Sequence, residues 1–191
     1  MTAPASKYFD LFCDMSAPEE RWYLGGPRGA NGELLKDALT SGRKYEGGAP
    51  LICTVDQPGP QLELTMTEEL VPVLNQRVAE IFAAHVGKDA QLIQARPSDS
   101  NAGLWVINVL SVVDCVDTVQ SKGVERWTAA DGQPELVGAF KKIEELRIDP
   151  ARAGGHAIFR PLGWDVAVII SEPLADALVQ AGVRCELTPV S

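Results

Sequence analysis

The decisive stretch of this sequence is QLIQARPSDSNAGLWVINVL, residues 91–110. Two strand-like runs, Gln91–Ala95 and Leu104–Leu110, flank a polar segment whose proline, serine, asparagine and glycine are typical of a turn. The pattern predicts a β-hairpin. Its second strand begins with consecutive apolar residues, Leu104–Ile107, which indicates that both faces of the sheet are covered there. We therefore expect Leu104–Leu110 to be a central strand.

Upstream of this hairpin, residue periodicity predicts strands, a glycine-rich turn and two helices. Asn75 is a good N-cap, and apolar residues at helical spacing follow it. The expected elements are the strands Lys7–Cys13, Arg21–Leu24 and Gln61–Met66, the turn Gly25–Pro27, and the helices Glu33–Leu39 and Asn75–Gly87.

Downstream of the hairpin, strands again predominate. The one helix expected there begins at Ser171, a plausible N-cap, and ends before Gly182. The strands are Val124–Trp127, Ile143–Ile148, Ala157–Arg160, Asp165–Ile170 and Arg184–Pro189. Together these elements predict an α+β fold with a mostly antiparallel sheet and a few packed helices, in a single compact domain spanning residues 1–191.

Composition narrows the classes of function. The 191 residues are 46% hydrophobic and 23% charged, which is typical of a globular protein. A formal net charge of -9 argues against direct binding of nucleic acid or anionic membranes, because both require a cationic surface. The natural partner of such a surface is basic.

The sequence shows neither the pattern of a secretion signal nor that of a membrane-spanning helix. Residues 1–7 form a short polar arm without the apolar core of a secretion signal, and the longest apolar stretch, Leu104–Val116, is too short and too interrupted to span a bilayer. Four dispersed cysteines, Cys13, Cys53, Cys115 and Cys185, form no metal-binding pair and resemble small buried hydrophobes. We expect a cytoplasmic protein.

A search for catalytic residues finds no convincing set. No hydrolase, metalloprotease or phosphate-loop motif occurs, and the two histidines, His85 and His156, are expected to be packed or solvated. We expect no catalytic residue, no metal and no cofactor. The alternative is a small metal- or ligand-binding enzyme that uses Asp114 and Asp117, joined by Glu125, but aspartates at that position more often bond the backbone of a turn.

Protein binding is the remaining class. Trp164 follows Pro161–Gly163 and is the tryptophan best placed for partial exposure and a protein contact. The carboxylates that could meet a basic partner are Asp114, Asp117, Glu125, Glu135, Glu144 and Glu145.

A family resemblance supports this class. It is carried, mostly by core residues and in order, by Trp105–Leu110, Val112–Asp117, Ser121, Ile143–Asp149, Ala157–Leu162, Ile169–Glu172, Ala181–Val183 and Leu187–Val190. These residues resemble immunity family eleven of the bacterial polymorphic-toxin systems, earlier classed as a domain of unknown function. Residues 1–50 match no pattern of that family, so we expect a divergent N-terminal part and a family-like core over residues 51–191.

The resemblance implies a cytoplasmic inhibitor, encoded beside a toxin that is often a nuclease, which protects the producing cell by capturing the toxin. It brings no contact residues and no catalytic set. A regulatory protein that binds a partner other than a toxin is a further alternative.

Overall fold

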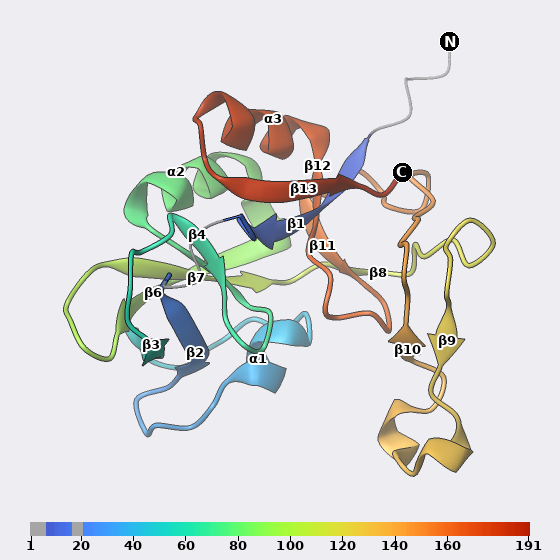
Figure 1. Cartoon of the computed structure of the whole chain (residues 1–191), viewed down its shortest axis with the longest axis horizontal. Coiled ribbons are helices and arrows are strands. Elements are labelled where there is room, and N and C mark those ends of the chain that lie inside the picture. Colours follow the sequence, from blue (N-terminus) through green and yellow to red (C-terminus); the bar gives the residue numbers. More distant parts are fainter. Residues whose placement is uncertain (1–6, 17–20) are drawn as a thin grey trace.

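The computed structural model describes residues 7–16 and 21–191, so all but the last residue of the polar N-terminal arm lies outside it. Within these residues the chain forms three α-helices, two larger β-sheets and a two-stranded projecting arm (Figure 1). Most strand pairs are antiparallel. The expected α+β class and single compact domain are confirmed.

The first sheet is built around the predicted hairpin. Ala90 pairs with Val109 and Ala95 with Leu104, and both strands of this hairpin lie in the interior of the sheet. In spatial order the strands are β2 (Tyr23–Arg28), β3 (Leu51–Gln57), β6 (Ala90–Pro97), β7 (Leu104–Val109), β5 (Pro72–Leu74) and β4 (Leu64–Met66). Val106 and Ile107 of β7 are fully buried in clusters on opposite faces, so the expectation of a doubly covered strand is confirmed.

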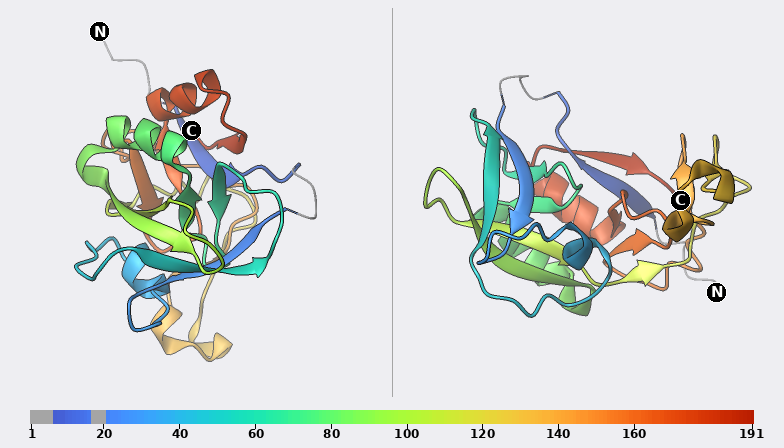
Figure 2. Two further views of the ribbon diagram at one scale, coloured as in Figure 1. Left: turned by 90° about the vertical axis from the view of Figure 1, so that its left-hand side faces the viewer. Right: turned by 90° about the horizontal axis from the view of Figure 1, so that it is seen from below.

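The second sheet joins the two ends of the described chain. In spatial order it contains β13 (Cys185–Pro189), β1 (Tyr8–Cys13), β12 (Ile169–Ser171), β11 (Ile158–Pro161) and β8 (Val112–Val113). β1 lies between β12 and β13, and the views in Figure 2 show the first and last strands side by side. β8 pairs with β11 in parallel at the edge.

The main core lies where the two sheets meet helices α2 (Gln76–His85) and α3 (Glu172–Gln180). Phe82 and Leu178 from these helices pack in one cluster with Ile107 and Ile170 from the sheets. The short helix α1 (Lys36–Thr40) covers the other face of the first sheet through Leu39. None of the helices in the described residues has the length and apolar character needed to span a membrane.

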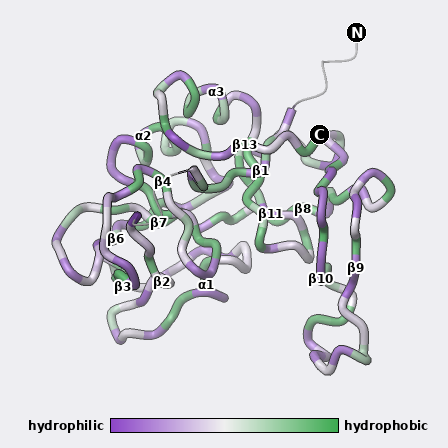
Figure 3. Tube along the Cα trace, viewed as in Figure 1, coloured by the Kyte–Doolittle hydropathy of each residue, from purple (hydrophilic) through white to green (hydrophobic). Residues whose placement is uncertain are grey.

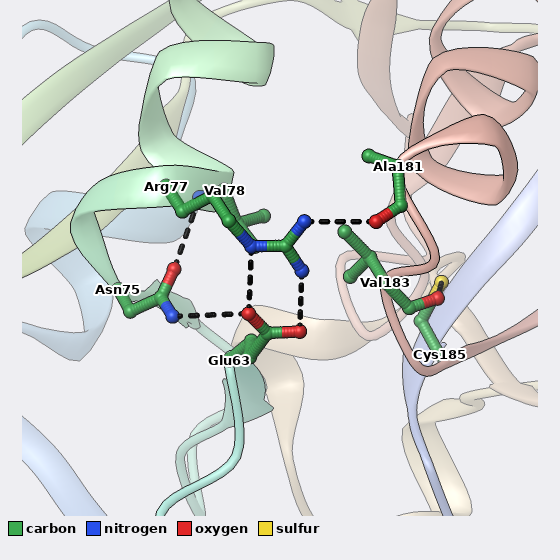
Figure 4. Close-up of polar contacts among 7 residues, drawn as sticks. All are labelled: Glu63, Asn75, Arg77, Val78, Ala181, Val183 and Cys185. Atoms are coloured by element: carbon green, nitrogen blue, oxygen red, sulfur yellow. Dashed lines mark hydrogen bonds and ion pairs between the residues drawn. The ribbon is translucent and has the colours of Figure 1, made fainter.

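A polar network on the surface ties these elements together (Figure 4). Arg77 of α2 donates two hydrogen bonds to Glu63, at 2.8 and 2.6 Å, and a third of 2.8 Å to the carbonyl of Ala181 after α3. The guanidinium of Arg77 binds both carboxylate oxygens of Glu63, and this bidentate geometry fixes the orientation of the two side chains as well as their distance. One arginine therefore connects the segment before β4 to both long helices.

The projecting arm is the part of the fold that differs most from the expectation. Its strands are β9 (Glu125–Arg126) and β10 (Phe140–Lys142), joined through short 3₁₀ helices at Ala129–Asp131 and Pro134–Leu136. All views in Figures 1 and 2 show it standing away from the sheets, and hydrophilic colour predominates along β9 and β10 in Figure 3. The strand expected at Ile143–Ile148 is wrong, because this segment makes only isolated bridges with neighbouring loops.

The expected turn at Gly25–Pro27 is also wrong, since these residues lie within β2. A Cβ atom on Gly25 would lie 2.2 Å from Oγ1 of Thr54, and one on Gly26 would lie 2.3 Å from Oε2 of Glu69. The two glycines therefore allow neighbouring side chains to pack directly against the backbone of β2. Glycine is used for such close approach as well as for turns.

The two helix N-caps give a matched test of the fold. The Asn75 side chain accepts a 3.0 Å hydrogen bond from the amide of Val78, whereas the Ser171 side chain makes no capping bond, contrary to the expectation from sequence. We expect Asn75→Ala to lower the free energy of unfolding by about 1 kcal/mol and Ser171→Ala to change it by much less. Urea denaturation of both variants measures this. Equal losses would contradict the assigned caps.

Candidate functional site

Asp114 and Asp117 have structural roles at the end of β8. The carboxylate of Asp117 accepts hydrogen bonds from the amides of Val119, at 2.9 Å, and Gln120, at 3.0 Å, and these bonds hold its pKa below the usual value. Asp114 is exposed and forms an ion pair of 3.2 Å with Arg152. The geometry is that of a turn and a surface ion pair.

A metal site is equally unsupported by the geometry. In the described ranges, 7–16 and 21–191, no three histidine, cysteine, aspartate or glutamate side chains are grouped so that they could hold a metal ion. Glu125, considered with Asp114 and Asp117 from sequence, lies instead on β9 of the arm.

A polar cluster surrounds Asp89, and no sequence motif indicates it. This carboxylate is buried and accepts hydrogen bonds from the ring of His156 at 2.7 Å, the hydroxyl of Ser111 at 2.9 Å and the amide of Ala157 at 2.8 Å. The aspartate lies between the serine and the histidine. In a catalytic triad the histidine must lie between the other two, so this arrangement does not activate Ser111 as a nucleophile.

The Asp89 cluster joins the two sheets. Asp89 precedes β6 of the first sheet, and His156 and Ala157 precede β11 of the second. The backbone carbonyl of Asp89 also accepts from the amides of Leu110 and Ser111, where β7 leads toward β8. Burial alone would raise the pKa of Asp89, but the hydrogen bonds from His156, Ala157 and Ser111 outweigh it, and the pKa lies below its usual value.

The acidic residues expected to meet a partner lie mostly on or beside the arm. Glu125 and Glu135 are exposed on it, while Glu144 pairs with Lys142 at 2.6 Å and Glu145 with Lys122 at 2.8 Å. Residues 117–147 contain six carboxylates and five basic side chains. The arm is therefore nearly neutral, and most of the net charge of -9 lies elsewhere.

A groove of about 640 Å³ brings together three of the seven predicted contact residues, Glu144, Glu145 and Trp164. We call it the acidic groove. It is lined by Asp10, Phe12, Leu70, residues 143–147, Trp164, Val166, Ala167 and residues 188–190. Five segments far apart in the sequence thus form one surface. Asp114, Asp117, Glu125 and Glu135 do not line this groove.

A second groove of about 620 Å³ lies on the other side of the turn between β11 and β12. It runs between that turn, helix α1 and the arm, and includes Lys36, Trp127 and Lys141. Trp164 and Val166 line both grooves. The turn therefore forms a ridge, residues 161–166, on which Leu162 is 55% and Val166 is 40% exposed.

Arg160 supports this ridge from below. Its side chain is fully buried, with Nη2 donating to the carbonyl of Leu70 at 2.9 Å and Nη1 donating to the carbonyl of Asp165. Burial lowers the pKa of Arg160 to about 10, and burial raises the pKa of nearby Asp10 to about 6. Leu70 has a positive φ of 57°, an unusual conformation for a branched side chain, so its bond to Arg160 holds a strained turn in place.

Sequence reasoning did not identify Arg160 or Asp10 as site residues. Arg160 lies in the Phe159–Arg160–Pro161 stretch, which contributes to the family resemblance, but no local pattern reveals that its guanidinium is buried. Charged side chains are seldom buried, so the default expectation for the fully buried Arg160 and the half-buried Asp10 is a solvated position.

The buried Asp89 predicts a specific acid sensitivity. Because its folded pKa lies below the unfolded value of about 3.9, its contribution to stability is complete above that pH and is lost as the pH falls through the folded pKa. We expect Asp89→Asn to lower the free energy of unfolding at pH 7 by about 1–3 kcal/mol and to flatten its pH dependence below pH ~4. Exposed Asp99→Asn is the matched control. Chemical denaturation across pH measures both effects, and equal slopes for wild type and Asp89→Asn would refute this role.

Comparison with known proteins bears on these grooves. A search of curated proteins finds no match to this chain. The model of an immunity protein family, Imm11, matches residues 88–186, from the 3₁₀ turn after α2 to β13. This segment includes the arm, the ridge and Arg160, whereas the division of the chain at residue 50 stays a prediction. Since the match covers more than half of the 191 residues, the chain belongs to the Imm11 immunity protein family.

Proposed function

We propose that this immunity protein neutralises a cognate toxin in the cytoplasm by binding it directly, without catalytic turnover. The observation that carries the proposal is the family match, because it includes the ridge and one wall of the acidic groove. An inhibitor of this kind needs a stable surface that complements its target, and the two grooves beside the ridge offer exposed apolar side chains next to charged ones.

The toxin that fits this protein best is a nuclease. A nuclease must be basic where it meets phosphate, and the net charge of -9 would draw such a surface toward the inhibitor. Complementary charge acts mainly on the rate of association, while apolar anchors act on the rate of dissociation. We propose that the toxin contacts some or all of the seven residues predicted from the sequence: Asp114, Asp117, Glu125, Glu135, Glu144, Glu145 and Trp164.

The absence of turnover is supported by the roles of the polar residues. Asp117 holds a turn, Asp114 pairs with Arg152, and Asp89 lies between Ser111 and His156. These groups are occupied with structural bonds, and they form no nucleophile and base aimed at one point.

A stoichiometric titration tests capture against catalysis. The toxin domain encoded beside the gene is assayed for nuclease activity with increasing amounts of this protein. We expect activity to fall in proportion to added protein and to vanish near one equivalent, because each inhibitor occupies one toxin. Progressive inactivation of excess toxin by a small fraction of an equivalent would contradict capture, and full activity at several equivalents would contradict the immunity function.

Salt dependence tests the charge argument separately. The Debye length shrinks from about 30 Å at 0.01 M salt to about 8 Å at 0.15 M, so steering by the net charge is screened. We expect the association rate with the toxin to fall steeply over this range and the dissociation rate to change little. Stopped-flow or surface-binding kinetics measure both rates. An association rate that ignores salt would remove the electrostatic part of the proposal.

A further inference from the structure

We propose that the acidic groove is the toxin-docking site, and that it receives an extended basic segment of the toxin with one large apolar side chain packed against Trp164. This inference rests on the proposed function. It adds which face docks, the chemistry of the docked segment, and a contact residue, Asp10, that sequence analysis did not single out.

The charge of the groove favours a basic occupant. Asp10, Glu144 and Glu145 line it, against the single basic side chain of Arg147. Nη1 of Arg147 already donates to the carbonyl of Pro189 at 2.6 Å, so this guanidinium is directed to the wall of the groove. Among the side chains that line the groove, three carboxylates therefore stand against one guanidinium.

The lysines paired with these glutamates do not block the site. Lys122 and Lys142 lie outside the groove lining, and in both ion pairs the two side chains are more than half exposed. Exposed pairs of this kind contribute about 0–1 kcal/mol, because water screens them and two flexible side chains must be ordered. Because these exposed pairs are weak, an incoming arginine or lysine can replace the two lysines at little cost.

The wall that carries the glutamates is fixed in advance. The amides of Glu144 and Glu145 donate to the carbonyl of Lys122 at 2.9 and 3.3 Å, and the amide of Arg147 donates to the buried hydroxyl of Ser121 at 2.9 Å. That hydroxyl donates in turn to the carbonyl of Arg147 at 3.1 Å. A preorganised wall lowers the entropy lost on binding.

The shape of the groove favours an extended occupant. One side is residues 143–147, and another is residues 188–190 at the end of β13, an extended strand at the edge of its sheet. The floor between them includes Phe12, Leu70 and the half-buried indole of Trp164. Large aromatic side chains in partly enclosed sites are typical anchors of protein interfaces.

Asp10 supplies a third carboxylate at this site. It lies on β1, where the Val168 backbone makes a hydrogen bond to its carboxylate, and burial keeps its pKa near 6. A cation brought in by the toxin would favour the ionised form of Asp10. The gain is larger than for an exposed carboxylate, because less water screens the pair.

Kinetics with groove variants test this assignment. The double variant Glu144→Lys, Glu145→Lys reverses charge at exposed positions, and we expect it to raise the Kd for the adjacent toxin at least about tenfold. Trp164→Ala is expected to raise the dissociation rate by about tenfold or more. Asp10→Asn is also expected to raise the Kd for the toxin.

The matched control is Glu80→Lys, Asp99→Lys, which makes the same charge change at exposed positions that do not line the groove. We expect its Kd to stay within about threefold of wild type, because only long-range steering changes. Thermal denaturation confirms that each variant is folded. Trp164→Ala could weaken binding through a packing defect. The double variant Glu144→Lys, Glu145→Lys tests the groove without this problem, because both glutamates are exposed.

The outcomes separate the two proposals. If wild type neutralises the toxin and the groove variants bind as well as the control, the acidic groove is not the docking site and the immunity function stands. If wild type fails to neutralise the toxin, the proposed function itself is wrong. If wild type sediments as a dimer that the double reversal dissociates, a second copy of this chain occupies the groove and the assignment to the toxin is overturned.

Discussion

The hydrogen bonds of the buried Arg160 guanidinium are the interaction on which the proposed docking surface depends. Taking a charged group out of water costs several kcal/mol, which hydrogen bonds to its donors offset only in part. Here two of the donors are used on the carbonyls of Leu70 and Asp165, which belong to turns of different sheets. Arg160 therefore holds the two turns against each other. The ridge between the grooves has its position because of this bond pair, and so does the conformation of Leu70 at positive φ.

The surface charge follows from the fold in a way that a charge count does not reveal. The arm and its base carry many charges, but three of the carboxylates pair with nearby lysines: Asp131 with Lys141, Glu144 with Lys142, and Glu145 with Lys122. The groove differs because Asp10 reaches it from β1 and Glu144 and Glu145 reach it from the base of the arm, while their lysine partners lie outside. Of the charged side chains that line the groove, three are acidic and only Arg147 is basic.

Much of the fold could be predicted from the sequence. Hairpin β6–β7 has a clear polar turn and an apolar run at Leu104–Ile107, and helices α2 and α3 have clear ends. The errors have physical causes. Gly25 and Gly26 resemble a turn, yet they lie in a strand because side chains from distant segments need the space of a Cβ. Ile143–Ile148 alternates like a strand, but its partners are short loops, so only isolated bridges form.

The candidate site was predictable only in part. Trp164, Glu144 and Glu145 could be selected as aromatic and acidic residues near turns, but their meeting in one groove depends on tertiary packing. Arg160 and Asp10 have no local signal, because burial of a charge results from contacts with residues far away in the sequence.

Amide hydrogen exchange of the free and toxin-bound protein tests the central claim most directly. The account predicts slower exchange on binding at residues 143–147, 162–167 and 188–190, around the acidic groove. Slower exchange confined to helices α2 and α3 or to the β6–β7 turn would contradict it.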